Sequence, residues 1–134
     1  MTREEIMNMP AGREMDKIIA EKVFGLEIRE TEKWVKSCVP SKLRQPDYKV
    51  SIISAGGLPL KNYSTDILAA WCLIDKMHEK EYQYTLRGYF MGGEQHVATF
   101  DNQDWADKNP LYRAHGATAT LAICRAALLT TLED

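Results

Sequence analysis

Apolar residues recur with a helical period near the start of the chain. They stand at i, i+3, i+4 and i+8: Met15, Ile18, Ile19 and Val23. This spacing predicts an amphipathic helix from Gly12 to Phe24, with Gly25 placed to end it. Ahead of it, Thr2 and Glu5 have the spacing of a capping box, which indicates a short first helix that Pro10 interrupts.

Two further stretches have helical periodicity. The second begins at Ser64, which we expect to be the N-cap, and ends near His78. Its apolar residues are Ile67, Ala70, Trp71, Ile74 and Met77. The third runs from Thr118 to Leu132 and has apolar residues on almost every side. Such a helix is buried on more than one face, or it closes an interface between copies of the chain.

Alternating apolar and polar residues indicate strands between and after these helices. We expect two extended runs, in residues 82–90 and 96–100, joined by a hairpin at Gly92-Gly93. Residues 49–54 resemble a shorter strand that Gly56-Gly57 ends. Helices combined with a small, mostly antiparallel sheet predict an α+β protein. We expect an alpha/beta/alpha sandwich with an apolar C-terminal helix.

Residues 26–61 form a long and mixed excursion within the predicted single domain, residues 1–134. Trp34 and Val35 lie there in a charged stretch, and three prolines punctuate it. The excursion is longer than an ordinary connection, so we expect part of it to pack against or bind something.

Composition adds limits on location and partners. The 134 residues carry 17 Lys and Arg against 19 Asp and Glu, a formal charge of −2, which disfavours a nonspecific grip on nucleic-acid polymers. No apolar run is long enough for a membrane span, and the acidic first residues lack the apolar core of a signal peptide. We therefore expect an intracellular protein without a membrane partner.

Neither a catalytic motif nor a cofactor motif is present in the sequence. There is no phosphate-binding loop, no nucleophile elbow and no HExxH pair, and no pair of carboxylates is arranged for acid–base work. The three histidines, His78, His96 and His115, are far apart in the chain. Cys72 and Cys124 lie within helical apolar patterns and are expected as small buried residues, and no cysteine pairing is suggested. We predict a protein that is not an enzyme and needs no cofactor or metal.

The best candidate for binding lies around the start of the last helix. Residues of suitable chemistry for an anion gather there: Arg113, His115, Thr118 and Thr120. Gly116 lets the backbone approach a ligand closely. Helix capping and solvation explain the same residues without a ligand. Arg125 is the one charge inside the last helix, and it needs an acidic partner, an escape to the surface or an anionic ligand.

Two weaker candidates lie elsewhere in the chain. Tyr63, Ser64 and Thr65 precede the middle helix, where hydroxyl groups suit an anion, although capping also accounts for them. Arg87 lies in a tyrosine-rich strand that includes Tyr82 and Tyr84 and that can stack a base. An ordinary sheet face is the alternative for that strand.

Three blocks of sequence resemble the phage ABA sandwich domain family. They are Met9 to Asp16 with Ile19 to Val23, Tyr63 to Ile67 with Ala69-Ala70-Trp71, and Leu121 to Leu129. The resemblance implies a small protein of a bacteriophage or prophage with an alpha/beta/alpha fold. It implies origin and fold more than function.

The phage context suggests interference with host defence. Our first hypothesis is a homo-oligomeric sponge in the cytoplasm of the infected host. It would sequester a cyclic nucleotide or another small, anionic, nucleotide-like immune signal. The alternative is a protein–protein interaction module that binds and inhibits a host protein.

Overall fold

The computed structural model describes residues 1–35, 48–88, 95–102 and 112–133. It contains four α-helices in these residues: α1 (Arg3–Asn8), α2 (Arg13–Lys22), α3 (Ile67–Glu79) and α4 (Ala119–Thr130). The described strands are β1 (Ile28–Val35), β2 (Tyr48–Ala55), β3 (Leu58–Pro59), β4 (Tyr82–Gly88), β5 (His96–Asn102) and β6 (Tyr112–Gly116). A 3₁₀ turn, Thr131–Glu133, follows α4.

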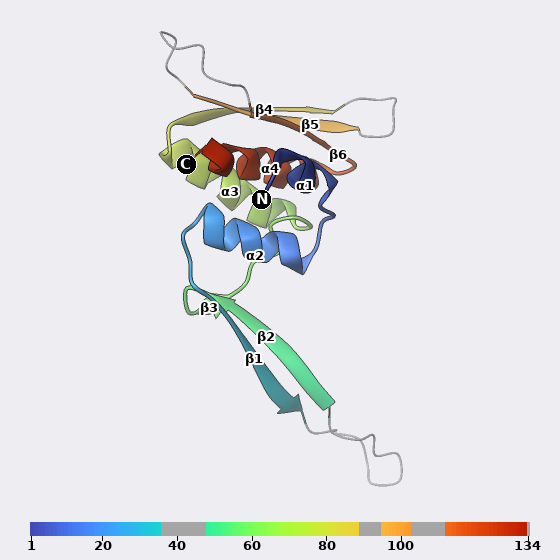
Figure 1. Ribbon diagram of the computed structural model, residues 1–134, viewed down its shortest axis with the longest axis vertical. Coiled ribbons are helices and arrows are strands. Elements are labelled where there is room, and N and C mark those ends of the chain that lie inside the picture. The colour runs from blue at the N-terminus through green and yellow to red at the C-terminus, as the bar shows by residue number, and fades with distance from the viewer. Residues whose placement is uncertain (36–47, 89–94, 103–111, 134) are drawn as a thin grey trace.

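The helices lie between two antiparallel sheets (Figure 1). One sheet has the order β4-β5-β6 and covers α4, whereas the other has the order β1-β2-β3 and projects from the opposite end of the molecule. The prediction of an α+β protein with mostly antiparallel strands is therefore confirmed.

Helix α4 is the centre of the core. Every residue from Thr120 to Leu129 is buried, because the helix packs against the sheet β4-β5-β6 on one side and against α1, α2 and α3 on the others. Burial on more than one face was predicted, and it is satisfied within a single chain. The apolar character of α4 therefore no longer argues for an oligomer.

The helix predictions hold with local corrections. The capping box of Thr2 and Glu5 is formed at the start of α1. Helix α2 ends at Lys22, two residues before the predicted end. The N-cap of α3 is Asp66, whose carboxylate accepts a hydrogen bond from the Leu68 N–H, and not Ser64 as predicted. Ser64 is unavailable for capping because its hydroxyl group is bound to another helix.

Three strands were not predicted: the two-residue β3 and, for different reasons, β6 and β1. In β6 the buried residues are Tyr112, Ala114 and Gly116, and two such small residues give only a weak strand signal. The pattern of apolar positions is equally weak in β1, because most of its residues are exposed and nothing imposes a period of two. The predicted Gly92-Gly93 turn lies outside the described residues, but β4 and β5 pair antiparallel on either side of it.

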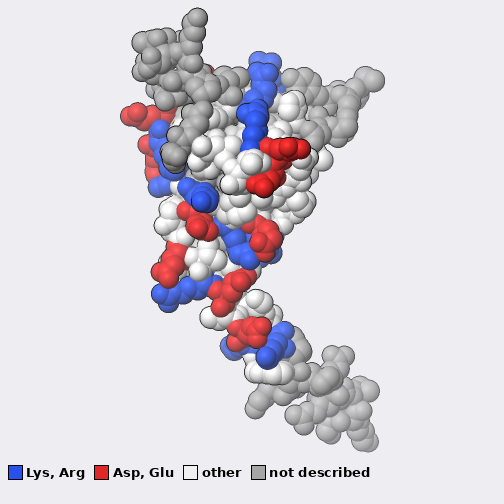
Figure 2. All heavy atoms as spheres, viewed as in Figure 1, with Lys and Arg blue, Asp and Glu red and all other residues white. Residues whose placement is uncertain are grey.

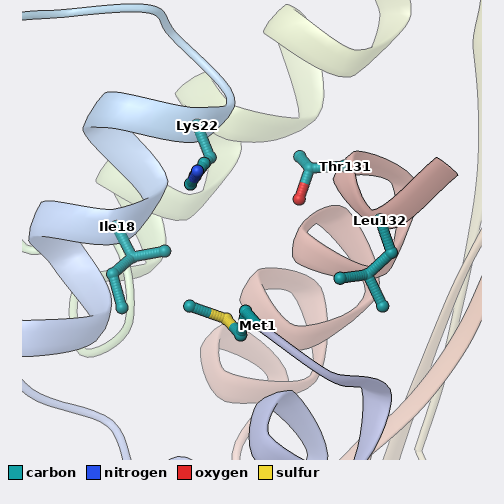
Figure 3. Close-up of a pocket in the computed structure, with 5 residues that line it drawn as sticks. All are labelled: Met1, Ile18, Lys22, Thr131 and Leu132. Atoms are coloured by element: carbon teal, nitrogen blue, oxygen red, sulfur yellow. The ribbon is translucent and has the colours of Figure 1, made fainter. Parts of the chain in front are cut away.

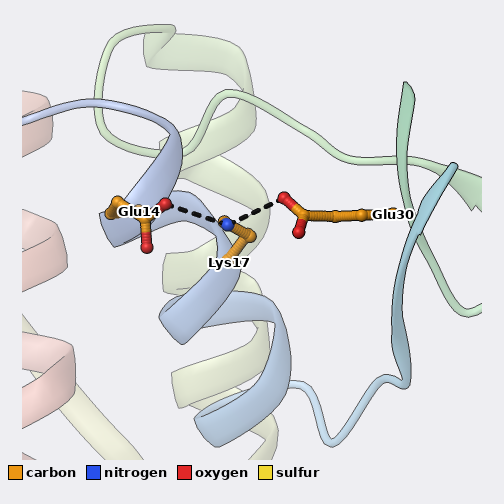
Figure 4. Close-up of polar contacts among 3 residues, drawn as sticks. All are labelled: Glu14, Lys17 and Glu30. Carbon is orange, nitrogen blue, oxygen red and sulfur yellow. Dashed lines mark hydrogen bonds and ion pairs between the residues drawn. The ribbon is translucent and has the colours of Figure 1, made fainter. Parts of the chain in front are cut away.

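Strands β1 and β2 form a two-stranded ribbon that extends away from the helices (Figure 1). Gly56 and Gly57, with φ of 60° and 82°, make the tight turn between β2 and β3, a conformation that favours glycine. Lys17 links α2 to the ribbon, since its ammonium group lies 2.9 Å from carboxylate oxygens of both Glu14 of α2 and Glu30 of β1 (Figure 4). These two carboxylates raise the pKa of Lys17.

Candidate functional site

Ser64 and Asp16 form a buried polar contact between α2 and the segment before α3. The Asp16 carboxylate accepts hydrogen bonds from the Ser64 hydroxyl at 2.7 Å and from the Ser64 N–H at 2.9 Å. The Ser64 hydroxyl in turn accepts a hydrogen bond from the Gly12 N–H at 3.0 Å. Both side chains are about 1% exposed. The structure thus gives Ser64, predicted as a ligand residue, a role in joining two elements.

The two threonines at the start of α4 also have internal partners. Thr118 caps the helix by accepting a hydrogen bond from the Leu121 N–H, so the capping role predicted as the alternative to ligand binding is confirmed. The Thr120 hydroxyl is buried and donates to the Ser64 main-chain oxygen at 2.8 Å. A Cβ atom on Gly116 would lie 2.8 Å from the Ala122 nitrogen. This glycine therefore allows β6 to lie close to α4. We predicted that it lets a ligand come close to the backbone, but in the structure it is helix α4 that comes close.

Arg125 is buried and bridges two distant segments of main chain. Its guanidinium group donates to the His115 carbonyl oxygen at 2.8 Å and to the Met9 carbonyl oxygen at 3.1 Å. These contacts join α4 to the end of β6 and to the link between α1 and α2. The sequence left open a structural role or a ligand-binding role for this charge, and the contacts in the structure are structural, with carbonyl oxygens among the partners.

Tyr63 and Thr65 differ in their environments. Tyr63 is buried, its ring stacks on that of Phe24 with centroids 5.1 Å apart, and burial raises its pKa. Thr65 is exposed. Of the predicted group Tyr63, Ser64 and Thr65, only Thr65 is open to solvent, so the three do not present hydroxyl groups to a common ligand.

The segments that carry the family resemblance meet in this buried network. Met9 and Asp16 come from the first block, Ser64 from the second and Arg125 from the third, and each makes a hydrogen bond to another part of the chain. The sequence signature therefore encodes how the helices are locked together. This explains why the resemblance predicted the fold better than a binding site.

Three of the predicted site residues are exposed and lie on one side of the sheet β4-β5-β6, where the central residues Val97 and Thr99 are buried. Ala98 and Phe100 of β5 point into the core, so Val97 and Thr99 between them point to the other side of the sheet. We call this side the outer sheet face; the strand register places on it Thr85, Arg87, Val97, Thr99, Arg113 and His115.

Within the outer sheet face, cationic and imidazole side chains flank the central strand. Arg87 and His115 lie on either side of Val97, and Arg113 lies beside Thr99 in the next row. All three flanking residues are exposed. Because neighbouring strands are about 4.8 Å apart, Arg87 and His115 are separated by roughly 10 Å across the sheet. This face can offer two guanidinium groups to a ligand with more than one negative charge.

The predicted base-stacking group is divided between the two sides of the sheet. Tyr82 packs edge to face on Tyr112 with centroids 6.0 Å apart, and Tyr84 packs in the same way on Trp71 of α3 at 5.8 Å. Both tyrosines belong to the side that faces the helices, whereas Arg87 belongs to the outer sheet face. Arg87 therefore has neither of these rings beside it to stack a base.

An exposed apolar surface lies on α3 and the neighbouring residue Tyr84 of β4, and it was not predicted. We call it the α3 patch; it consists of Ile67, Leu68, Trp71 and Tyr84. Leu68 is 76% exposed and Trp71 is 46% exposed. The helical spacing of Ile67 and Trp71 suggested core positions, but α3 buries the opposite side, with Ala70, Leu73, Ile74 and Met77. A possible signal was the width of the apolar stripe, which exceeds what one buried face of this helix requires.

Among the pockets lined by described residues, two flank the helices. One, of about 310 Å³, adjoins the α3 patch and is lined by Lys61, Asn62, Asp66, Leu68, Ala69 and Cys72. The other, of about 190 Å³, lies between α2, the N-terminal residue and the end of α4, and is lined by Met1, Ile18, Lys22, Thr131 and Leu132 (Figure 3). The second is smaller than most pockets for drug-sized ligands, and the one charged side chain in its wall is that of Lys22.

Charges of both signs are interspersed on the surface. Figure 2 shows them alternating over α2 and along the ribbon, without a broad field of one sign on this side of the molecule. Within the described ranges, no three metal-ligating side chains form a cluster. The described part of the chain also contains no helix long and apolar enough to cross a membrane.

The cysteines of the helices are consistent with packing roles. Cys124 is buried in α4, and burial raises the pKa of its thiol, which disfavours the reactive thiolate. Cys72 is half-buried on α3. Cys38 lies outside the described residues.

Comparison with known proteins identifies relatives. The pattern of the phage ABA sandwich domain matches residues 17–128. The fold is similar to that of a phage protein from Bacillus cereus ATCC 14579, known from a 2.0 Å crystal structure, with a TM-score of 0.60 and 23% identity. That similarity covers 90% of this chain and 92% of the other. No curated protein matches the sequence.

Proposed function

The chain belongs to the phage ABA sandwich domain family, and we propose that it is a phage binding protein without enzymatic activity that binds another protein through the α3 patch. The observation that carries the proposal is the exposure of large apolar side chains on one helix. Trp and Tyr residues supply much of the binding energy at protein interfaces, and contiguous exposed apolar surface marks such interfaces.

The geometry of the α3 patch favours a protein partner over a small molecule. Trp71 is held edge to face against Tyr84, so the ring loses little additional freedom when a partner covers it. Leu68 stands beside the shallow pocket, which Lys61, Asn62 and Asp66 border with polar groups. An apolar centre with a polar border is the usual arrangement of a protein interface. The partner we infer is a host protein in the cytoplasm of the infected cell, presenting apolar side chains to this patch.

The test is capture from host lysate with matched variants. Leu68→Asp places a charge in the α3 patch, and Leu58→Asp places the same charge at a residue on β3 that is 69% exposed. We expect a partner to be retained by the wild type and by Leu58→Asp and to be lost with Leu68→Asp. Equal capture by all three proteins would reject the α3 patch as the binding surface.

The outer sheet face favours a second candidate, which is the capture of a small anionic nucleotide-like signal. Arg87, Arg113 and His115 are exposed on this face, so the hypothesis of a sponge for a host immune signal keeps three of its residues. Two arginines separated by one strand suit a ligand with two phosphate groups.

Calorimetric titration with cyclic di- and trinucleotides and cyclic ADP-ribose variants tests this second function. We expect Arg87→Ala and Arg113→Ala to weaken binding, whereas Arg29→Ala, an exposed arginine of the ribbon, leaves it unchanged. The absence of heat with every ligand, or equal affinity in all three variants, would rule out the outer sheet face as a nucleotide site.

A further inference from the structure

The ribbon leaves one edge of β2 without a strand beside it in the described structure. Strand β3 pairs only with Ser54 and Ala55, and the Leu60 N–H donates to the Ile53 carbonyl oxygen at 3.1 Å. The edge from Tyr48 to Ile52 continues beyond these contacts. Two of its residues are apolar and exposed, Val50 at 38% and Ile52 at 45%. Exposed strand edges of this kind are templates for pairing with another chain.

We propose that this edge is a dimer interface at which β2 pairs antiparallel with β2 of a second copy, centred on Val50. Val50 is the midpoint of the edge from Tyr48 to Ile52, so a twofold axis there matches the whole edge with itself and stops before Leu60. The four strands would then be ordered β1-β2-β2-β1. A two-stranded ribbon is only marginally stable in water, whereas a four-stranded sheet is more stable.

The direction of the main-chain groups agrees with this register. The Ile53 oxygen points toward β3, so by alternation Lys49 and Ser51 also direct their N–H and C=O groups toward the open edge. With the axis at Val50, Lys49 lies opposite Ser51 of the copy, and both can exchange hydrogen bonds. Val50 lies opposite Val50 in the pair without hydrogen bonds, where side chains are closest. No like charges face each other.

The open edge of β1 does not have this complementarity. A twofold axis pairs each residue with one on the same side of the sheet, so registers centred on Thr31, Glu32 or Lys33 are the central ones available to β1. They place Glu30 against Glu32, Glu32 against itself or Lys33 against itself. Like charges directly opposite each other destabilise a sheet. The charge pattern therefore selects the β2 edge and a second copy of this chain as its occupant.

The experiment combines mass measurement with cross-linking. We expect sedimentation over a wide range of concentration to show a dimer, and Val50→Lys to weaken it by at least about tenfold, because two lysines would meet at the axis. Thr31→Lys adds the same charge to β1 on the same side of the ribbon and should leave the dimer intact. Circular dichroism checks that both variants are folded.

Cysteine variants test the register. With Cys38 and Cys72 replaced by Ser, Val50→Cys should form an intermolecular disulfide on oxidation, because Cα atoms in such a pair are about 4.5 Å apart. Ile52→Cys should not, since the two copies of residue 52 would be about 14 Å apart. A wild type that is monomeric throughout, a dimer that Val50→Lys leaves intact, or equal cross-linking at both positions would overturn the proposal. None of these outcomes depends on the α3 patch.

Discussion

Single buried residues determine how the helices are held together. Asp16 and Arg125 are charged side chains in the interior, and each is stabilised by hydrogen bonds to groups that are far away in the sequence. A buried polar group that loses its partner keeps the cost of leaving water. Substitution of these residues should therefore affect stability more than any exposed charge does.

For Asp16 we predict a large loss of stability. Asp16→Ala removes the acceptor of both the Ser64 hydroxyl and the Ser64 N–H, which remain buried, so the free energy of unfolding should fall by about 3 kcal/mol. Glu21→Ala removes an exposed carboxylate from the same helix and should change it by less than about 0.5 kcal/mol. Urea unfolding followed by circular dichroism measures both, and similar values for the two would contradict a structural role.

For Arg125 the choice between structure and ligand can be decided directly. Arg125→Met keeps much of the side-chain volume but leaves the carbonyl oxygens of Met9 and His115 without this donor, so we expect a loss of about 2–3 kcal/mol. Arg113→Met, on the exposed outer sheet face, should change stability by less than about 0.5 kcal/mol. If Arg125→Met unfolds at the same urea concentration as the wild type, the structural role is wrong and the ligand role that the sequence also allowed is favoured.

At the scale of elements, the sequence was informative wherever an element buries many large apolar side chains. The period of α2 and the all-round apolar surface of α4 predicted helices that the structure contains. In contrast, β1 is exposed on both sides and β6 buries only small residues beside Tyr112, so neither had a strong pattern. Because β6 was missed, Arg113 and His115 were expected beside Thr118, whereas strand alternation turns them to the outer sheet face.

The close packing of β6 against α4 gives an element-scale prediction. Gly116→Ala places a Cβ atom 2.8 Å from the Ala122 nitrogen and 3.2 Å from the Leu121 side chain, so β6 or α4 must shift. We expect a loss of about 1–3 kcal/mol, as in other overpacked cores. Gly88→Ala is the matched control, because the nearest atom to its new Cβ is 3.9 Å away. A thermal melt that shows equal midpoints for the two variants would refute this account of Gly116.

At the scale of the whole molecule, the body, which consists of the four helices and the sheet β4-β5-β6, differs from the ribbon in how much of it is buried in the core. The buried core draws on all four helices and on β4, β5 and β6, whereas among the ribbon side chains that the structure describes only Ile28, Ile53 and Ala55 contribute to it. The expectation that residues 26–61 would either pack or bind something thus separates into two parts. The base of the ribbon packs, and the remainder is available for the pairing that its open edge permits.

Removing the outer ribbon should therefore leave the body folded. Thr31 of β1 lies opposite Ile52 of β2. Because the main-chain oxygen of Ile53 points toward β3, the main-chain groups of Ile52 point toward β1, and Thr31 and Ile52 form a hydrogen-bonded pair. A two-residue Asn-Gly turn can join such a pair, so it can replace residues 32–51. The described side chains that are lost lie outside the core, and the link from Lys17 to Glu30 is kept. We expect the free energy of unfolding to change by less than about 1 kcal/mol. Sedimentation should show a monomer, because the edge centred on Val50 is gone. If the shortened chain no longer unfolds cooperatively in urea, the ribbon is part of the folding unit and the division into body and ribbon fails.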